Sequence, residues 1–297
     1  MNNIFNTQPA RKVCLEIVLL ILLVILGGYF FGSKIILTLV AFFAASLANA
    51  TAIGGGFLFM PLFIFIYQLP PLMALKLSIA TQAFGMTSGA LTWGRKYIDK
   101  KAFTLASVAS ISGVWFATHS WTLPSGFIKP LFALVSLGVF FALVIEMSLK
   151  VSSVQMEAKF STHTVSFLYI LSAFAGGLLT GWTAIGVGEV VALYLLFFYR
   201  LRLDIAIGTG VAVLAVSSIA GFILHADLGG IPWDLLVFTV PGVILGGRYG
   251  VKTAKFLESN VGQSNSEKWY KTSPLKLIFS LVILVDCIVI LLLEFLL

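Results

Sequence analysis

The chain has 297 residues, of which 59% are hydrophobic and only 10% are charged. Soluble domains carry about 25% charged residues, so this composition excludes a soluble enzyme or binding module and predicts a surface that faces lipid. The net charge of +7 comes from basic residues in short loops between apolar runs, which indicates orientation in a membrane rather than nucleic-acid binding.

Apolar segments long enough to cross or enter a bilayer follow one another along the chain. They fall near 13–32, 35–50, 53–69, 72–93, 102–122, 128–148, 164–182, 186–199, 204–225, 232–250 and 275–297. A full crossing takes about 20 residues, so 35–50, 53–69 and 186–199 are short. We expect 35–69 and 164–199 to form two hairpins, each of which begins and ends on one face of the membrane. Their lengths are compatible both with arms that cross fully and with arms that stop at mid-depth.

The basic residues predict how these spans are oriented. All of the 19 Lys and Arg except Lys34, Lys76 and Lys129 fall on one side of the predicted spans. Cytoplasmic loops carry such an excess of basic residues, so this side is predicted to be cytoplasmic. The sequence therefore predicts a multi-pass protein of the inner (plasma) membrane with a cytoplasmic N-terminus.

Two glycine-rich stretches indicate an internal repeat. Residues 50–61 read "ATAIGGGFLFMP" and residues 182–193 read "WTAIGVGEVVAL", and they align without a gap at an offset of 132 residues. Span 72–93 runs from outside to inside, whereas its counterpart 204–225 runs the other way, so the repeats are predicted to be inverted. Inverted repeats with broken helices are a recurring plan of secondary transporters.

The predicted fold class is thus an all-α polytopic membrane protein, in which inverted-topology repeats carry glycine-broken helical hairpins that meet near the membrane midplane. The expected division is an N-terminal repeat half at 1–148, in which span 128–148 begins the second half, and a cytoplasmic linker at 149–163. It continues with a C-terminal repeat core at 164–257, a cytoplasmic loop at 258–274 and a last span at 275–297.

The two breaks are the first candidates for a binding site. A break frees backbone N–H groups, each of which costs several kcal/mol in hydrocarbon unless protein, water or a ligand pairs it. A helix that resumes after a break also presents N–H donors and partial positive charge to an anion. We therefore predict a shared anion site built by Thr51, Gly54, Gly55, Gly56, Thr183, Gly186 and Gly188. The alternative is that the glycines only allow close helix packing.

Glu189 follows the second break, at the position where the first repeat has Phe57. An ionisable residue inside an apolar stretch is a functional candidate. A charged Glu189 would repel an anion, so its protonation is predicted to accompany anion binding and to couple proton and anion transport. The alternative is a neutral, hydrogen-bonded structural glutamate.

Other polar residues on the paired spans complete the predicted substrate site. Asn49 precedes the first break and is a candidate to cap it, and the remaining candidates are Ser78, Gln82, Thr209 and Ser217. The hydroxyls have a structural alternative, because they can bond to carbonyls of their own helix. For Gln82 the alternative is a helix–helix hydrogen bond.

No metal or cofactor site is predicted. Cys14 and Cys287 lie far apart in apolar runs, and the three histidines lack metal-ligand spacing. The expected partners are a small anionic substrate and membrane lipid, with no nucleic acid and with a homo-oligomer as an open possibility.

At these residues the chain resembles the sulfite exporter TauE/SafE family of membrane transporters. The resemblance extends from about residue 35 to 257 and rests on "IGGGFLFMP", "ALKLSIATQ", "GGLLTGWTAIGVGEVVAL", "AIGTGVAVLAVSSIAGFILH" and "PGVILGGRYG". The first motif is close to the family's glycine-rich pattern followed by a proline, here Pro61. In the second motif, Val187 replaces a usual glycine, Glu189 is present and Leu193 stands where the proline aligns.

The resemblance implies transport of sulfur oxyanions, organosulfonates or related organic anions. We accordingly predict a secondary transporter of a small anion, sulfite-like or sulfoacetate-like, that works by alternating access with proton coupling. No nucleotide-binding motif is present, so direct drive by ATP would need a separate subunit. The alternatives are a passive anion channel and a membrane-embedded enzyme, and against the enzyme no Ser-His or His-Glu constellation converges.

Overall fold

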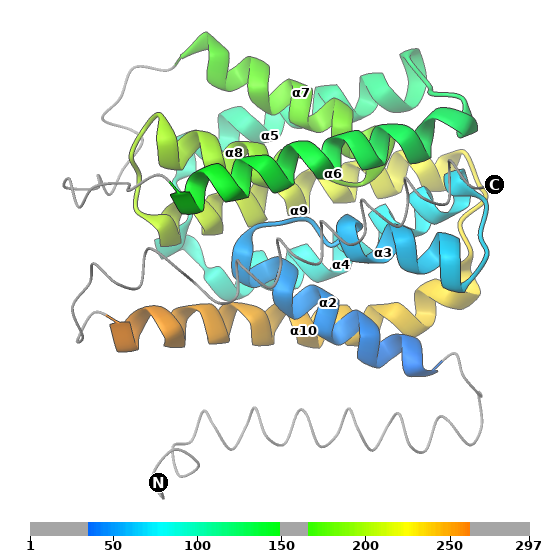
Figure 1. The fold of residues 1–297 in the computed structure, drawn as a ribbon, viewed down its shortest axis with the longest axis horizontal. Coiled ribbons are helices and arrows are strands. Elements are labelled where there is room, and N and C mark those ends of the chain that lie inside the picture. Colours follow the sequence, from blue (N-terminus) through cyan, green and yellow to red (C-terminus); the bar gives the residue numbers. More distant parts are fainter. Residues whose placement is uncertain (1–34, 149–165, 262–297) are drawn as a thin grey trace, which may run out of the picture.

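A computed structural model describes residues 35–148 and 166–261 of the chain. All regular elements in these two ranges are helical, and no β-strand occurs within them (Figure 1). The predicted spans 13–32 and 275–297 and the linker 149–163 lie outside the described residues. So does most of the loop 258–274, and the predicted domain division stays a prediction.

The helices of the first described range follow the predicted apolar segments. They are α2 (Ile36–Thr51), α3 (Gly56–Pro61), the π-helical turn η2 (Leu62–Ile66), α4 (Pro71–Trp93), the 3-10 turn η3 (Arg95–Tyr97), α5 (Lys100–Trp115), the π-helical turn η4 (Phe116–Ser120) and α6 (Ser125–Ser148). Local chemistry sets several of the ends. Pro71 stands at the first position of α4, where its missing N–H costs nothing, and the Asp99 side chain caps the amides of Lys101 and Ala102 at the start of α5.

The second described range contains α7 (Phe167–Thr183), α8 (Val187–Phe197), α9 (Leu203–Asp227) and α10 (Trp233–Val261). Within the described residues, Asp204–Asp227 and Trp233–Lys255 are long and apolar enough to cross a membrane by length and composition. The helices at 36–51, 56–66, 167–183 and 187–197 are apolar but shorter, in keeping with the predicted hairpin arms.

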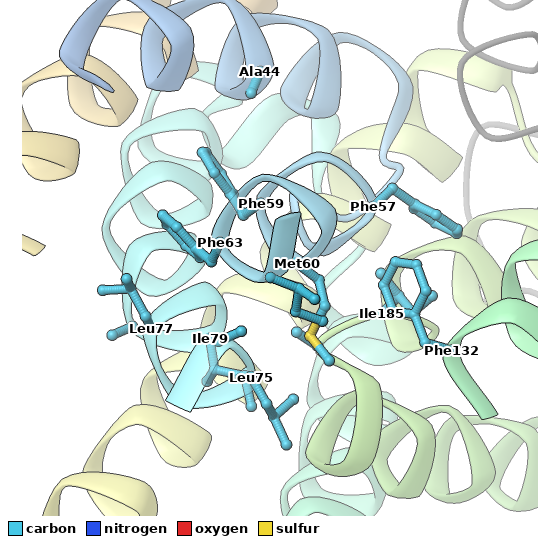
Figure 2. Close-up of a cluster of buried hydrophobic side chains, with 14 of the residues drawn as sticks. Ala44, Phe57, Phe59, Met60, Phe63, Leu75, Leu77, Ile79, Phe132 and Ile185 are labelled. Carbon is cyan, nitrogen blue, oxygen red and sulfur yellow. The ribbon is translucent and has the colours of Figure 1, made fainter. Parts of the chain in front are cut away.

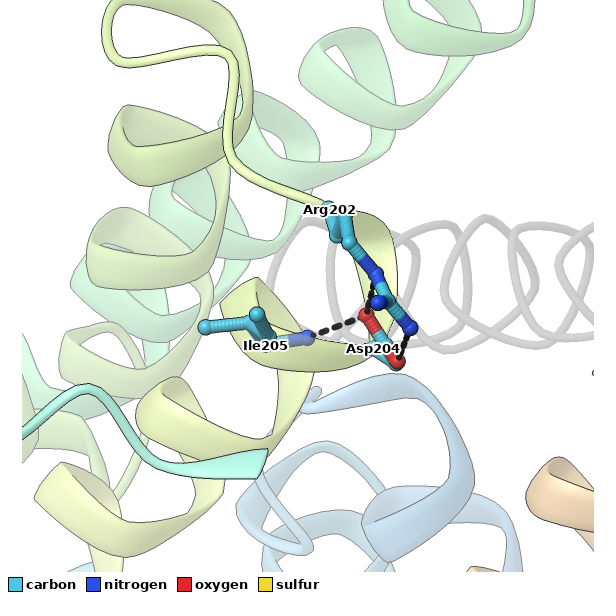
Figure 3. Close-up of polar contacts among 3 residues, drawn as sticks. All are labelled: Arg202, Asp204 and Ile205. Carbon is cyan, nitrogen blue, oxygen red and sulfur yellow. Dashed lines mark hydrogen bonds and ion pairs between the residues drawn. The ribbon is translucent and has the colours of Figure 1, made fainter. Parts of the chain in front are cut away.

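The start of α9 is held by a charged group on the predicted cytoplasmic side. The guanidinium of Arg202 forms an ion pair with the buried carboxylate of Asp204 (Figure 3). The same carboxylate accepts a hydrogen bond from the backbone N–H of Ile205 at 2.9 Å. An acidic group at a helix start compensates the free amides and the dipole there.

Glycines let the long helices approach to backbone contact. On α10, Gly242, Gly246 and Gly250 recur every fourth residue and face α2, where a Cβ atom on each would lie 1.9–2.2 Å from the carbonyl oxygens of Thr38, Phe42 and Ser46. Between α5 and α7, Gly113 and Gly177 make the equivalent close approach. Small residues of this kind are typical of helix packing in membranes, where dispersion contacts replace the hydrophobic drive. In the first hairpin α2 therefore packs against α10, and in the second hairpin α7 packs against α5 (Figure 1).

An apolar cluster fixes the position of α3. Phe57, Phe59, Met60 and Phe63 are fully buried on α3 and η2, and they pack against α4 residues such as Leu77 (Figure 2). Phe59 and Phe63 stack on one side of α3, whereas Phe57 points to the other side and meets Phe132 of α6 (Figure 2). Close packing on both sides therefore fixes the position of the helix that follows the first break.

The backbone geometry of the breaks recurs at the offset seen in the sequence. Four non-glycine residues in the described ranges have positive φ, and they form two pairs, Ala52 with Ala184 and Gln68 with Arg200. Both pairs are separated by 132 residues. Ala52 and Ala184 end α2 and α7 in nearly the same left-handed conformation, with φ of 61° and 63°. The two hairpins thus share local structure as well as sequence, and the inverted orientation stays a prediction.

Candidate functional site

The two breaks lie against each other in the interior of the helix bundle. A Cβ atom on Gly56 would lie 2.4 Å from the carbonyl oxygen of Ala184, and one on Gly188 would lie 2.9 Å from the carbonyl oxygen of Ala52. These two contacts are reciprocal, because Gly56 aligns with Gly188 and Ala52 with Ala184. The glycines at these positions therefore allow the backbones of the two breaks to touch.

The carboxylate of Glu189 joins the two breaks. Its Oε1 accepts a hydrogen bond from the backbone N–H of Gly54 in the first break, and its Oε2 accepts one from the N–H of Gly186 in the second, at 3.1 Å. Glu189 is 3% exposed and stands in the first turn of α8. Gly186, with φ of +129°, adopts a conformation that other residues rarely reach, and this lets its N–H turn back toward the carboxylate.

Gln82 from α4 completes this polar cluster. Its Oε1 accepts from the backbone N–H of Gly56 at 3.0 Å, and its Nε2 donates to the hydroxyl of Ser218 on α9 at 2.9 Å. All of the polar groups involved are buried. Amides from the two breaks, one carboxylate and one carboxamide therefore meet at the junction of α3, α4, α8 and α9. We call the cluster of Gly54, Gly56, Gln82, Gly186 and Glu189 the break site.

The two breaks use the aligned positions Phe57 and Glu189 differently. Phe57 points into the apolar cluster, where its ring lies 6.2 Å from that of Phe132 on α6 and beside Ile185 (Figure 2). Glu189 instead directs its carboxylate to the amides of both breaks. Only one ionisable group thus enters the break site from this pair of positions.

Thr51 and Thr183, which were predicted to bind the substrate, form hydrogen bonds within their own helices at the ends of α2 and α7. The hydroxyl of Thr51 donates to the carbonyl of Leu47 at 3.0 Å, and that of Thr183 donates to the carbonyl of Leu179 at 2.7 Å. Their role as substrate ligands stays a prediction. Gly55 also belongs to the first break, but a Cβ there would meet the ring of Phe59 at 2.9 Å, so its missing side chain serves packing.

Asn49 is buried beside the first break without capping it. Its Nδ2 donates to the carbonyl of Ala45 in its own helix, and its backbone carbonyl accepts from the indole N–H of Trp93. Its Oδ1 has no hydrogen-bond partner among the described residues. The predicted cap is therefore not formed, because the side chain turns back along α2 and lies against Gly89 of α4.

Ser78 lies one turn before Gln82 on the same side of α4. Its hydroxyl is fully buried and has no hydrogen-bond partner within the described ranges. Residues four apart on a helix are neighbours, so Ser78 lies beside Gln82 on the surface of α4. A buried unpaired hydroxyl is uncommon in a folded protein, and the role of Ser78 as a substrate ligand stays a prediction.

Thr209 and Ser217 lie at other helix contacts. The hydroxyl of Thr209 accepts from the backbone N–H of Asp99, which precedes α5. Ser217 pairs its hydroxyl with that of Ser110 on α5 at 2.7 Å. The structure therefore brings Gln82, Glu189 and the break glycines together, while these two side chains connect α9 to α5 and the turn before it.

Ser218, whose hydroxyl accepts from the carboxamide of Gln82, was not among the residues predicted for the site. A second omission is Leu214, whose side chain would meet Cβ atoms placed on Gly54 and Gly188 at 3.5 and 2.9 Å. Both residues lie on α9, and an apolar helix sequence gives no signal of which face will contact a break.

A pocket of about 740 Å³ lies between α4, α9 and α10, and none of the break-site residues lines it. Ala83 and Ile219, the neighbours in sequence of Gln82 and Ser218, line it, and Arg248 and Thr92 line it as well. Its wall is otherwise mainly apolar. No group of three or more His, Cys, Asp or Glu side chains in the described part of the chain is placed to hold a metal ion.

Comparison with known proteins decides the family. The sequence model of the family described as "Sulfite exporter TauE/SafE" matches residues 37–263, which include both breaks and the helices from α2 to α10 except the first residue of α2. The chain belongs to the sulfite exporter TauE/SafE family. The resemblance drawn from the sequence motifs is thereby confirmed, and so is the character of the chain as a membrane transporter protein.

A curated relative supports the same assignment. The "Probable membrane transporter protein YjnA" of Bacillus subtilis (strain 168) is 22% identical over 246 residues, which cover 75% of this TauE/SafE chain and 94% of the relative. No solved structure matches the chain.

Proposed function

We propose that this TauE/SafE protein is a secondary transporter of a small anion with a sulfur oxyanion or sulfonate head, such as sulfite or sulfoacetate. The observation that carries the proposal is the break site, where amides from two separate breaks converge on a single carboxylate. Backbone N–H groups aimed at one buried point form a good environment for the oxygens of an anion. The family description supports the choice of sulfur oxyanions.

Alternating access is proposed as the transport mechanism. Two repeats of opposite orientation can adopt two related conformations, one open to each side of the membrane. The reciprocal contacts of Gly56 with Ala184 and of Gly188 with Ala52 support a pseudo-symmetric arrangement of the two breaks. The side that carries Arg95, Arg202 and Arg248 is proposed to face the cytoplasm.

Proton coupling is proposed to act through Glu189. Its carboxylate is the one acidic group of the break site, and a negative charge there opposes the entry of an anion. Protonation removes that opposition, so a proton is expected to bind together with the anion. Flux should then depend on the pH gradient as well as on the anion gradient.

The test is flux of sulfite, thiosulfate, sulfoacetate, taurine and simple carboxylates in proteoliposomes. A transporter gives saturable flux that follows an imposed pH gradient, whereas flux that rises linearly with concentration and ignores that gradient would indicate the passive channel. Chemical alteration of the solute would indicate an enzyme.

In the Glu189→Gln variant, flux should lose its dependence on pH. A pH profile identical to that of the unchanged protein would refute the coupling role.

A further inference from the structure

We infer that the Glu189 carboxylate is a tethered occupant of the anion site, which holds the amides of both breaks until the head group of the substrate displaces it. The inference rests on the proposed function in one respect, namely that the break site is where the transported anion binds. It adds that protein and substrate use the same N–H donors in turn, and it defines the head group that the site accepts.

The hydrogen bonds show that the donors are already occupied. Gly54 and Gly186 donate to the two oxygens of Glu189, and Gly56 donates to Gln82. Hydrogen bonds from backbone amides to a carboxylate are stronger than those between neutral groups. In this conformation an incoming anion would therefore find no free amide at these three positions.

The space at the site is filled as well. A Cβ atom on Gly54 would lie only 3.2 Å from Oε1 of Glu189 and 3.3 Å from Oε1 of Gln82. A site without room for a methyl group on Gly54 has no room for a second oxyanion beside the carboxylate. Two negative head groups in such a buried place would also repel each other strongly. Substrate and carboxylate consequently exclude one another.

The geometry of the donors defines the ligand. Two amides from different breaks are bridged by two oxygens that share one central atom, the carboxyl carbon of Glu189. A sulfite, sulfonate or carboxylate group presents oxygens in the same manner, whereas a halide is a single centre and cannot reproduce the bridge.

The exchange also accounts for the charge at the site. The amides of the two breaks are never left unpaired in the membrane interior, because either the carboxylate or the substrate accepts from them. When the substrate binds, Glu189 leaves the amides, and the proton of the proposed coupling step neutralises its charge away from them. One group thus serves the empty protein as a substitute anion and the loaded protein as a proton acceptor.

The test uses purified full-length protein and small carboxylates as probes. Glu189→Ala removes the tethered group and leaves a cavity beside free amides. At constant pH and ionic strength, formate and acetate should raise the unfolding temperature of this variant, because a ligand that binds only the folded state stabilises it. Chloride at equal concentration should have a much smaller effect, and the unchanged protein should not respond to formate. Asp227→Asn, which removes an exposed carboxylate at the end of α9, is the matched control and should behave like the unchanged protein.

The affinity for the substrate gives a second readout. A single charge-assisted hydrogen bond corresponds to about tenfold or more in binding. Sulfite should therefore stabilise Glu189→Ala at a concentration at least about tenfold lower than it stabilises the unchanged protein at neutral pH. Glu189→Asp, whose shorter side chain cannot bridge both amides, should fall between the two, and it replaces Glu189→Ala if that variant does not fold.

The outcomes separate this inference from the proposed function. If neither Glu189→Ala nor Glu189→Asp gains anion affinity, the carboxylate is a structural cap and the inference is overturned, even where sulfite flux is observed. If formate binds the variants but no sulfur anion is transported by the unchanged protein, the tethered occupant is supported and the proposed substrate class fails.

Discussion

Replacing Gly56 by alanine is expected to separate the two breaks. The new Cβ atom would lie 2.4 Å from the carbonyl oxygen of Ala184 and 2.8 Å from a methyl group of Ile185, and ordinary contact begins at 3.4 Å. The first break must therefore move by about 1 Å relative to the second. The neighbour at the shorter distance is backbone, so a change of side-chain rotamer cannot absorb the clash.

The expected cost of Gly56→Ala follows from two effects. Overpacking of a close-packed interior costs about 1–3 kcal/mol. The same displacement stretches the hydrogen bond from Gly56 N–H to Gln82, which is 3.0 Å long, and loss of such a bond costs about 0.5–1.5 kcal/mol. The unfolding free energy should thus fall by about 2–4 kcal/mol, and anion flux should fall with it because the donors no longer converge.

The assay is thermal unfolding in detergent, together with flux in proteoliposomes at matched protein content. Gly188→Ala, with nearest contacts at 2.9 Å, should be less damaging than Gly56→Ala. Gly138→Ala on α6 is the control, because a Cβ there meets nothing within 4 Å. A Gly56→Ala protein as stable and active as the control would refute the close apposition of the breaks.

Three further predictions concern the surroundings of the site. Gln82→Leu leaves the buried N–H of Gly56 unpaired and should lower the unfolding free energy by about 1–3 kcal/mol, as measured by thermal or chemical unfolding, and an unchanged value would contradict the observed pairing. Gly250→Ala places a Cβ 1.9 Å from the carbonyl of Ser46 and should destabilise the protein by about 1–3 kcal/mol, whereas Gly126→Ala, in open space, should be neutral in the same unfolding assay. Lys255→Met removes the ammonium group that donates to the carbonyls of Thr92 and Trp93. The free energy of local opening at the end of α4, measured by hydrogen exchange, should fall by about 1.5–3 kcal/mol. Unchanged exchange there would show that these contacts are weak.

The helices were largely predictable from the sequence because apolar runs and glycine breaks mark their ends directly. Segments 35–50 and 164–182 became α2 and α7, and both end one residue before the left-handed alanine of the Thr-Ala-Ile-Gly motif. Glu189 was also predictable as a site residue, because it is an ionisable residue inside an apolar run. The substrate roles of these residues remain predictions.

The partners within the site were not predictable, because they depend on contacts between distant segments. The carboxylate of Glu189 reaches Gly54 across 135 residues, and the carboxamide of Gln82 reaches Ser218 across 136. Thr209 shows the same limitation. Its predicted role followed from its place on a span that pairs with the breaks, but the close contact of Gly208 with the carbonyl of Tyr97 turns that part of α9 toward the start of α5.

The glycine contacts between α2 and α10 have a consequence for how the protein is made. The hydroxyl of Thr38 donates to the carbonyl of Phe238, which is translated 200 residues later. During synthesis, α2 is therefore made before its partner helix. The surface of α2 that contacts α10 stays uncovered until α10 leaves the ribosome. A nascent chain stopped before α10 should be a substrate for membrane chaperones and quality-control proteases, and the two segments should become protected together only after the whole of α10 has left the ribosome.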